Sequence, residues 1–254
     1  MLPQGTAIFQ VRGACRLAIG VGPVRVSLAA VTPDSLRVMT ANLWSWHCEP
    51  SGLADVLRDQ DPDVLAVQEL HWGCVEVIKH HFPHNHLDPH HETLGTGIAA
   101  RRAFAVERLP VTYRGGWIAK LDSAAWPHLP SPIEVVNVHF ANPVGWPWTN
   151  SYRVRRRQLD VVAAHISSTR SRTVVVGDFN ASPAWPVYRE MARRMTDSAV
   201  EAGTVLRTWR FRGMTPPLLR IDHAFVKNAR GVRTWTVEVP GADHLALVAD
   251  IAFS

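Results

Sequence analysis

The sequence predicts an α/β fold, and two observations support that prediction. After Pro33, short apolar runs alternate with helix-like stretches and turn signals, which is typical of strands interleaved with helices. The chain has 254 residues, of which 46% are hydrophobic, and this is ample material for a substantial buried core. Because no internal repeat or linker follows residue 35, we expect an N-terminal extension over residues 1–35 and one domain over residues 36–254.

Seven apolar segments are predicted to be strands, and two amphipathic segments are predicted to be helices. Residues 173–177 are rich in β-branched side chains, which is typical of a buried strand, and residues 36–43, 64–68, 96–100, 133–140, 221–226 and 246–253 show similar short apolar runs. A short amphipathic pattern over residues 53–59 ends at the turn over residues 61–63, and a longer pattern covers residues 151–168.

Polar residues suited to metal or phosphate chemistry follow these strands. A single polar residue at a strand end is ordinary, because polar side chains often cap strands. Six such positions in order along the chain indicate an active site, because scaffolds place catalytic groups on the loops at strand ends. The positions are Asn42, Glu69, His139, Asp178 with Asn180, Asp222, and Asp243 with His244.

The motifs around these positions resemble a known family. They are TANL (residues 40–43), QE (68–69), NVH (137–139), GDFN (177–180), RIDH (220–223) and DH (243–244). This ordered set is similar to the endonuclease/exonuclease/phosphatase superfamily, which includes deoxyribonuclease-like and sphingomyelinase-like metal-dependent phosphoesterases. The resemblance extends from about residue 36 to the C-terminus. It implies a four-layer α/β sandwich, in which two packed, mostly antiparallel β-sheets are flanked by helices.

Glu69 is predicted to be the principal metal ligand, with Asn42 beside it. Mg²⁺ prefers oxygen ligands, and a carboxylate with an amide oxygen provides them; Mn²⁺ is the alternative metal. The resemblance also places Asp243 near the metal. Such an ion would polarise the phosphoryl oxygen and offset the charge that develops on the leaving oxygen.

Asp178 and Asn180 are predicted to act on the attacking water. Residues two apart in an extended chain point to the same side, so one can accept a proton while the other holds the water or a phosphate oxygen. Adjacent residues face opposite ways, which makes Asp243 a poor partner for His244. We expect Asp222 to hold the His244 imidazole and favour its charged form, a pairing that the resemblance also implies.

His139 and His244 are expected to flank the phosphate and stabilise its negatively charged transition state. The alternative for each is an ordinary buried histidine. His223 follows Asp222 on the same strand and is expected to point away from the site. Abasic-site endonucleases of the family place a tyrosine near the phosphate, and His139 occupies the comparable position here. A dedicated base-excision role is therefore not expected.

The charge of the chain favours an anionic partner. The formal net charge is +5, and arginine far exceeds lysine among the 27 basic residues. Guanidinium groups match phosphate oxygens, although a GC-rich genome would produce the same excess. Trp146 and Trp148 follow His139 and lead to Arg155 in the predicted helix. We predict that these three bind substrate, by stacking on bases or by inserting into a membrane interface; packing onto the domain is the alternative for the tryptophans.

The predicted function is hydrolysis of a phosphoester by in-line attack of water, with a divalent metal as cofactor. Nucleic acid is the first expected substrate because of the basic charge. A phospholipid or lipid-linked phosphate is the alternative because of Trp146 and Trp148. A catalytically silent binding module is a third hypothesis, and the complete set of catalytic residue types argues against it.

Other features have simpler interpretations. The histidines between residues 80 and 91 lie in a stretch with two prolines and no cysteine, so we expect a loop rather than a zinc site. Three cysteines without a CxxC pair predict no disulfide framework. No apolar run is long enough to span a bilayer, and arginines interrupt the apolar stretch before Val31. We expect a monomer that is cytoplasmic rather than secreted.

Overall fold

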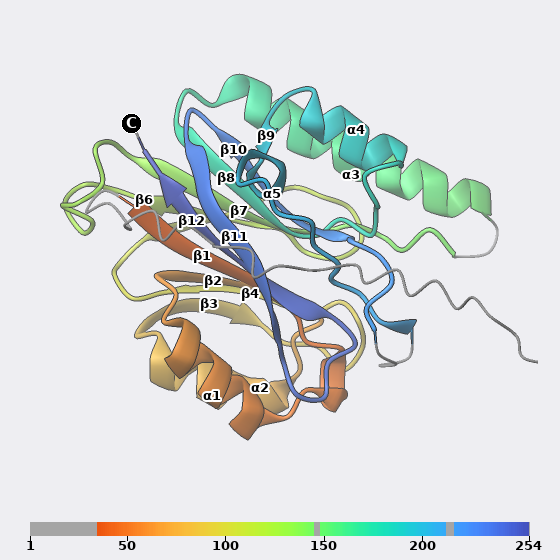
Figure 1. Ribbon diagram of the computed structural model, residues 1–254, viewed down its shortest axis with the longest axis horizontal. Helices are drawn as coiled ribbons and strands as arrows, with labels where there is room; N and C mark the ends of the chain where they lie inside the picture. The colour runs from red at the N-terminus through yellow and green to blue at the C-terminus, as the bar shows by residue number, and fades with distance from the viewer. Residues whose placement is uncertain (1–34, 145–147, 212–215, 254) are drawn as a thin grey trace, which may run out of the picture. The chain divides into compact units, whose positions relative to one another are not determined.

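Two six-stranded sheets pack face to face in the computed structural model (Figure 1), which describes residues 35–144, 148–211 and 216–253. Trp148 is described by its backbone alone. Apart from Ser35, the extension that the sequence predicts over residues 1–35 lies outside the described residues. No helix within the described ranges is both long enough and apolar enough to cross a bilayer.

The first sheet has the strand order β11-β12-β1-β2-β4-β3. Among its described strands, only β1 and β2 are parallel, and the other neighbours are antiparallel. The strands are β1 (Ser35–Asn42), β2 (Val64–Gln68), β3 (His84–Asp88), β4 (Thr96–Ala100), β11 (Arg230–Glu238) and β12 (Leu245–Ala252).

The second sheet has the order β5-β6-β7-β8-β10-β9 and repeats this arrangement. Its described strands also contain one parallel pair, β7 with β8, between antiparallel neighbours. The strands are β5 (Ala105–Arg108), β6 (Trp117–Leu121), β7 (Ile133–His139), β8 (Arg172–Asp178), β9 (Thr196–Asp197) and β10 (Asp222–Lys227). The expectation of two mostly antiparallel sheets is confirmed.

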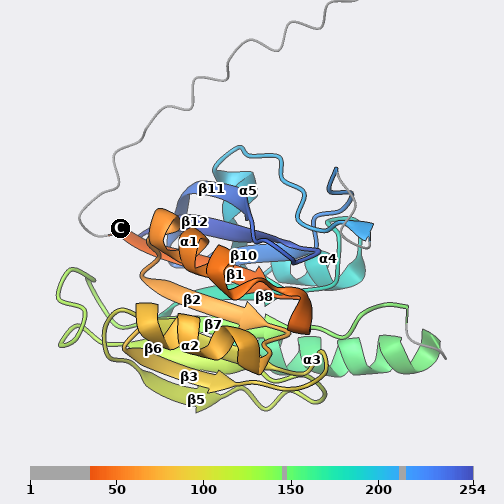
Figure 2. The ribbon, with the colours of Figure 1, turned by 90° about the horizontal axis from the view of Figure 1, so that it is seen from below.

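Helices cover the outer face of each sheet (Figure 2), which completes the four layers. Side chains alternate along β1, so that Leu36 and Val38 fill the layer between the sheets while Met39 and Ala41 pack on the helical side. The helices beside the first sheet are α1 (Pro50–Gln60) and α2 (Trp72–His81), and those beside the second are α3 (Trp148–Ser168) and α4 (Pro186–Ala192). Two shorter helices, η1 (Ser45–His47) and α5 (Ser198–Glu201), lie in connections.

The histidine-rich stretch is not the continuous loop that the sequence predicts. His80 and His81 end α2, and β3 begins at His84. β3 is the edge strand of its sheet, and its residues are only partly buried, so it pairs with β4 without needing an apolar face. Propensity and periodicity therefore gave no signal for this strand, because backbone pairing determines it.

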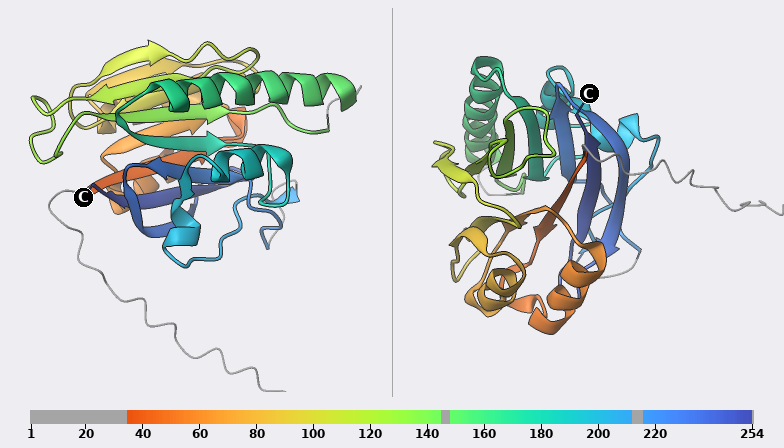
Figure 3. Two further views of the ribbon diagram at one scale, coloured as in Figure 1. Left: turned by 90° about the horizontal axis from the view of Figure 1, so that it is seen from above. Right: turned by 90° about the vertical axis from the view of Figure 1, so that its left-hand side faces the viewer.

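The strand ends that carry the candidate site residues lie at one edge of the molecule, because of the directions in which the strands run (Figure 3). β1 and β2 are parallel, as are β7 and β8, so the ends at Asn42, His139 and Asp178 lie together. β10 runs the opposite way and begins with Asp222 paired to Asp178. β12 runs opposite to β1, so its first residue, Leu245, starts near the same edge.

Candidate active site

Side-chain hydrogen bonds join the two sheets beneath the candidate site. Asn42 Nδ2 donates to Asp178 Oδ2 at 3.1 Å, and Gln68 Nε2 donates to Asn137 Oδ1 at 2.7 Å. The amide of Asn137 in turn donates to the carbonyls of Val67 and Gly97. These side chains are buried, and each pair links one sheet to the other. A satisfied polar network of this kind fixes how the two halves of the site face each other.

Asp178 and Asn180 are held together by a turn. Gly177 has φ of 143°, and a Cβ there would lie 1.9 Å from the Val138 carbonyl oxygen, so glycine permits the close approach of β8 to β7. Asn180 donates to Asp178 through its backbone N–H (2.7 Å) and its side-chain amide (2.9 Å). The sequence predicted extended chain here, but Asn180 is left-handed with φ of 47°. The turn, and not strand alternation, brings the two side chains together.

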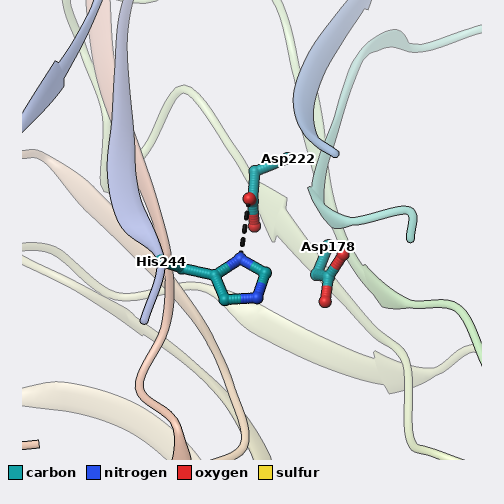
Figure 4. Close-up of side chains that lie close together, drawn as sticks. All are labelled: Asp178, Asp222 and His244. Carbon is teal, nitrogen blue, oxygen red and sulfur yellow. Dashed lines mark hydrogen bonds and ion pairs between the residues drawn. The ribbon is translucent and has the colours of Figure 1, made fainter. Parts of the chain in front are cut away.

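Asp222 accepts a hydrogen bond from the His244 imidazole, with 2.8 Å between Oδ2 and Nδ1 (Figure 4). Both side chains are buried. Burial alone would lower the pKa of His244, but the charge and hydrogen bond of Asp222, together with the charges of Asp178 and Asp243, raise it to about 10. The imidazole is therefore a cation at neutral pH and suits an anionic ligand.

Asp178 lies beside this pair and is also buried (Figure 4). Burial, and then the charge of Asp222, raise the pKa of Asp178 to about 7, although His244 and the Asn180 backbone act in the opposite direction. A carboxylate with this pKa can exchange a proton with water near neutral pH, which is what a general base requires.

Glu69 shares a neighbour with Asp178, because a carboxylate oxygen of each lies within 4.0 Å of His139 Nε2. It follows β2 in a left-handed conformation, and its carboxylate is 3.8 Å from His139 Nε2. Burial raises the pKa of Glu69, the charge of Asp243 adds to this, and Arg114, His244 and a hydrogen bond with Asn42 lower it. Burial likewise raises the pKa of Asp243, which accepts a hydrogen bond from the Trp209 indole at 3.2 Å.

A family model decides the relationship of the chain to known proteins. The model described as "Endonuclease/Exonuclease/phosphatase family" matches residues 39–244, which span every candidate site residue from Asn42 to His244. The chain belongs to this family. No curated protein matches the sequence.

Solved structures share the fold at low sequence identity. An endonuclease/exonuclease/phosphatase protein from Beutenbergia cavernae superimposes with a TM-score of 0.68 at 18% identity, covering 87% of this chain and 72% of its own. TDP2 from D. rerio, complexed with single-strand DNA product, gives 0.66 at 18%, with 85% and 98% covered. The 3′ phosphatase NExo from Neisseria, bound to a product DNA hairpin, gives 0.64 at 19%, with 84% and 98% covered.

The endonuclease/exonuclease/phosphatase family uses divalent metals, and one group of residues fits such an ion. Asn42 is not oriented as the oxygen ligand that the sequence predicts, because its amide oxygen accepts from the Trp44 backbone N–H and its Nδ2 donates to Asp178. Glu69 and Asp243 offer carboxylate oxygens, and burial disfavours the ionised form of each. A divalent cation would reverse that effect by giving each carboxylate a positive neighbour. These residues therefore fit a hard metal ion.

A second group is compact enough to hold a metal but fits one less well. Asp178, Asp222 and His244 each place one ligand atom within 4.8 Å of the others. However, the imidazole of His244 is protonated and bonded to Asp222, and an imidazolium has no lone pair for a metal. This cluster is better suited to holding a phosphate and a water.

Arg114 is a site residue that sequence reasoning missed. Its guanidinium is buried, contacts His139 Nε2 through Nη1, lies 3.9 Å from the Glu69 carboxylate and donates to Thr93 Oγ1 at 3.1 Å. Burial, and then the charges of Arg114 and His244, hold the pKa of His139 well below its usual value, so His139 is neutral. No sequence pattern pointed to Arg114, because it lies in a connection just before two glycines rather than at the end of a predicted strand.

The remaining predicted residues are not brought into the cluster. Arg155 is buried, donates to the Ala141 carbonyl and lies over the Trp185 ring. These contacts occupy its guanidinium outside the cluster. Trp146 and the side chain of Trp148 lie outside the described residues. His223 points away, as expected, and contacts the Ala181 carbonyl through Nε2 at 2.8 Å.

Proposed function

We propose that this protein hydrolyses a phosphoester by in-line attack of water, with Mg²⁺ as its cofactor and Mn²⁺ as the alternative. The observation that carries the proposal is the buried arrangement of Asp178 beside the Asp222–His244 pair. It combines a carboxylate whose pKa is about 7 with an imidazolium whose pKa is about 10. A base and a fixed cation within one small space suit an attack by water on an anionic centre.

Asp178 is the proposed general base. Its Oδ2 accepts hydrogen bonds from Asn42 and Asn180, which fix the carboxylate, and Asn180 is close enough to orient the same water. The water would give its proton to Asp178 as its oxygen forms the new bond to phosphorus. The leaving oxygen departs on the opposite side of the phosphorus, which is the meaning of in-line attack.

His244, Arg114 and His139 are the proposed phosphate-binding groups. His244 and Arg114 supply positive charge, and neutral His139 supplies a hydrogen-bonding ring between them. Groups fixed in advance at the place where negative charge develops stabilise the transition state more than the ground state. When bound by Glu69 and Asp243, a divalent cation would supply further stabilisation of charge on the phosphoryl and leaving oxygens.

Nucleic acid is the substrate class that we propose first. The formal net charge of +5 favours a polyanion. Similarity of fold to a TDP2 bound to single-strand DNA product and to a 3′ phosphatase bound to a DNA hairpin supports the same choice. Within this class, both phosphodiester cleavage and removal of a terminal phosphate are compatible with the site.

A phospholipid or lipid-linked phosphate is the second candidate. The observation that favours it is a set of exposed apolar side chains on the segments around the site, among them Trp46 and Trp72. Such side chains suit a substrate that is presented at a lipid surface.

A panel of phosphoesters tests the proposal. Wild type and Asp178→Asn are assayed on single-strand DNA, duplex DNA with a 3′ phosphate, phospholipid in mixed micelles and bis-p-nitrophenyl phosphate, with Mg²⁺, with Mn²⁺ and with EDTA. We expect metal-dependent hydrolysis that falls at least about a hundredfold in Asp178→Asn. Asp55→Asn, an exposed carboxylate on α1, is the control.

Two results would contradict the proposal. One is turnover that persists in EDTA-treated protein, and the other is equal rates in wild type and Asp178→Asn. Binding of a panel member by both proteins without any hydrolysis would instead favour a silent binding module.

A further inference from the structure

Exposed apolar side chains are concentrated beside the site. The described residues include eleven large apolar side chains that are exposed to solvent. Eight of them lie on the segments that follow β1, β2 and β7, that flank Arg114, or that contact Asp243. We use the name apolar rim for six of these: Trp46, Trp72, Tyr113, Val144, Tyr152 and Leu218.

Two members of the apolar rim are anchored to the proposed metal ligands. Trp46 lies in η1, where the preceding Ser45 N–H donates to the Glu69 carbonyl at 3.1 Å. Its indole is 65% exposed and stacks on His47. Trp72 begins α2 three residues after Glu69, is 46% exposed, and has its ring 4.2 Å from that of His91. Neither indole covers the hydrophobic core.

Two tyrosines of the apolar rim lie on segments next to the proposed phosphate-binding residues. Tyr113 precedes Arg114, and its carbonyl accepts a hydrogen bond from Gln158, which also donates to the His139 carbonyl. Tyr152 lies near the start of α3 and lines a groove of about 680 Å³ together with Trp185. Both phenol rings are exposed.

Leu218 extends the apolar rim next to Asp243. Its backbone N–H donates to the Trp209 carbonyl at 2.7 Å, and the Trp209 indole donates to the Asp243 carboxylate. Val144 lies five residues after His139. Each of five separate segments that carry or contact site residues therefore holds an exposed apolar side chain.

The opposite edge of the sheets differs in character. A depression there is lined by Arg170, Arg172, Arg230 and Asn228, at the start of β8 and at the connection between β10 and β11. No large exposed apolar side chain belongs to those segments within the described residues. Exposed apolar side chains are therefore concentrated on the site segments, although Val106, Val200 and Val205 lie elsewhere.

We propose that the apolar rim docks the protein on an anionic lipid surface with the active site facing that surface. Tryptophan and tyrosine are favoured at the boundary between water and lipid, and valine and leucine gain from entering the acyl region. The exposed arginines Arg156, Arg189 and Arg193 line the groove at Tyr152 and complement anionic headgroups. Val144 and Leu218 cannot stack on bases, whereas all six members of the rim can enter a lipid interface, so a single-stranded nucleic acid is the less favoured occupant.

The docking surface rests on the proposed function only for the identity of what is cleaved. If the apolar rim enters the boundary between water and lipid, a phosphoester in the headgroup layer can reach Asp178 and His244. The rim would also exclude bulk water from the mouth of the site. Within the proposed function, the docking surface therefore favours the second substrate candidate, a phosphoester anchored in a membrane, over the nucleic acid that the net charge favours.

Vesicle sedimentation of the full chain tests this surface. The inactive Asp178→Asn protein is mixed with vesicles of phosphatidylcholine alone or of phosphatidylcholine with 30% phosphatidylglycerol, so that hydrolysis cannot affect binding. We expect binding to the anionic vesicles, and binding at least about tenfold weaker after Trp46→Ser and Trp72→Ser are combined. Val200→Ser on α5 is the matched control, because Val200 is 63% exposed and lies outside the rim.

The same variants are made in the active background to separate the two proposals. Hydrolysis of soluble bis-p-nitrophenyl phosphate and the melting temperature should stay unchanged, since neither indole touches the catalytic groups. Should the double variant melt early, Tyr152→Ser on the exposed face of α3 replaces it. Loss of vesicle binding with intact soluble hydrolysis is the expected pattern.

Three outcomes would overturn the docking surface. The protein could stay in the supernatant with both kinds of vesicle. The double variant could sediment as well as the control. The rim substitutions could weaken binding of single-strand DNA while leaving sedimentation unchanged, which would assign the rim to nucleic acid. Vesicle binding without hydrolysis of any phosphoester would instead preserve the surface and refute the proposed function.

Discussion

Nδ1 of His244 lies 2.8 Å from Oδ2 of Asp222, and both side chains are buried against Asp178. The pair links the residue before β12 to the first residue of β10, and so joins the last strand of one sheet to the other sheet. A buried carboxylate that accepts from an imidazole fixes the orientation of the ring and keeps it charged. The site therefore contains a permanent cation at neutral pH.

Replacing Asp222 tests the role of this cation. Asp222→Asn keeps the size of the side chain but removes its charge, so the pKa of His244 should fall from about 10. We expect kcat/KM at pH 8 to fall by about a hundredfold or more, and by less at pH 6, where the imidazole regains its proton. The alkaline limb of the pH profile should move to lower pH. Asp55→Asn serves as the control, and an unshifted alkaline limb would refute the assignment.

Removing one carboxylate tests the proposed metal ligands. Glu69→Gln should weaken Mg²⁺ binding, measured by calorimetry, by roughly tenfold or more, because a neutral amide attracts a divalent cation less strongly. Metal at a hundred times its Kd stabilises the folded state by about 2.7 kcal/mol, so Mg²⁺ should raise the melting temperature of wild type. The rise should be smaller in Glu69→Gln. Glu76→Gln, which changes an exposed carboxylate on α2, should behave as wild type; equal Mg²⁺ affinity in Glu69→Gln would exclude this ligand set.

Replacing Arg114 tests its proposed role in phosphate binding, which no sequence motif indicated. Arg114→Gln removes a positive charge beside Glu69 and His139, and we expect kcat/KM to fall by about ten- to a hundredfold. Arg114→Lys should restore the loss only in part, because an ammonium cannot reproduce the planar set of donors. Arg108→Gln, at an exposed arginine of β5, is the comparison. Kinetics of Arg114→Gln that match Arg108→Gln would place Arg114 outside the phosphate site.

His223 makes the stability of the fold depend on pH. Burial lowers its pKa to about 4 from a usual value near 6.5, so the unfolded chain binds a proton more readily than the folded chain between these values. The contribution of neutral His223 is complete above pH 6.5 and is lost as the pH falls toward 4. We expect the cost to reach about 2 kcal/mol at pH 5.

Urea unfolding at pH 7.5 and pH 5 measures this effect. His223→Gln should be less stable than wild type at pH 7.5 but should lose less of its stability on acidification. Other buried groups titrate in both proteins, so the informative quantity is the difference between them. The same pH dependence in wild type and His223→Gln would contradict the assignment.

The strands that the sequence predicted well are those buried on both faces. Val64–Gln68 and Thr96–Ala100 have the expected bounds, because continuous apolar runs end abruptly at polar residues. β5 and β3 escaped prediction, because β5 is fully exposed and β3 is only partly buried. Their pairing with β6 and β4 depends on backbone hydrogen bonds, which leave little trace in the order of apolar and polar residues.

The sequence allowed us to predict which residues come together in the candidate site where a motif marked the end of a strand. Asp178 and Asp222 follow that rule, since both lie where apolar strands begin or end. Arg114 does not, because its place depends on how a glycine-rich connection crosses to His139. The left-handed turn at Asn180 was equally invisible, since asparagine in a sequence does not reveal its backbone angles.

The position of β12 has a consequence for truncated chains. This strand follows His244 directly and lies between β11 and β1, in the interior of its sheet and not at the margin. A frameshift or proteolytic cut shortly before Asp243 would leave β1 without a neighbour on one side and would remove the strand with which β11 pairs. Such a cut would also remove His244 and the strand that fixes its place, so the shortened chain should lack the Asp222–His244 pair altogether rather than hold a weakened form of it.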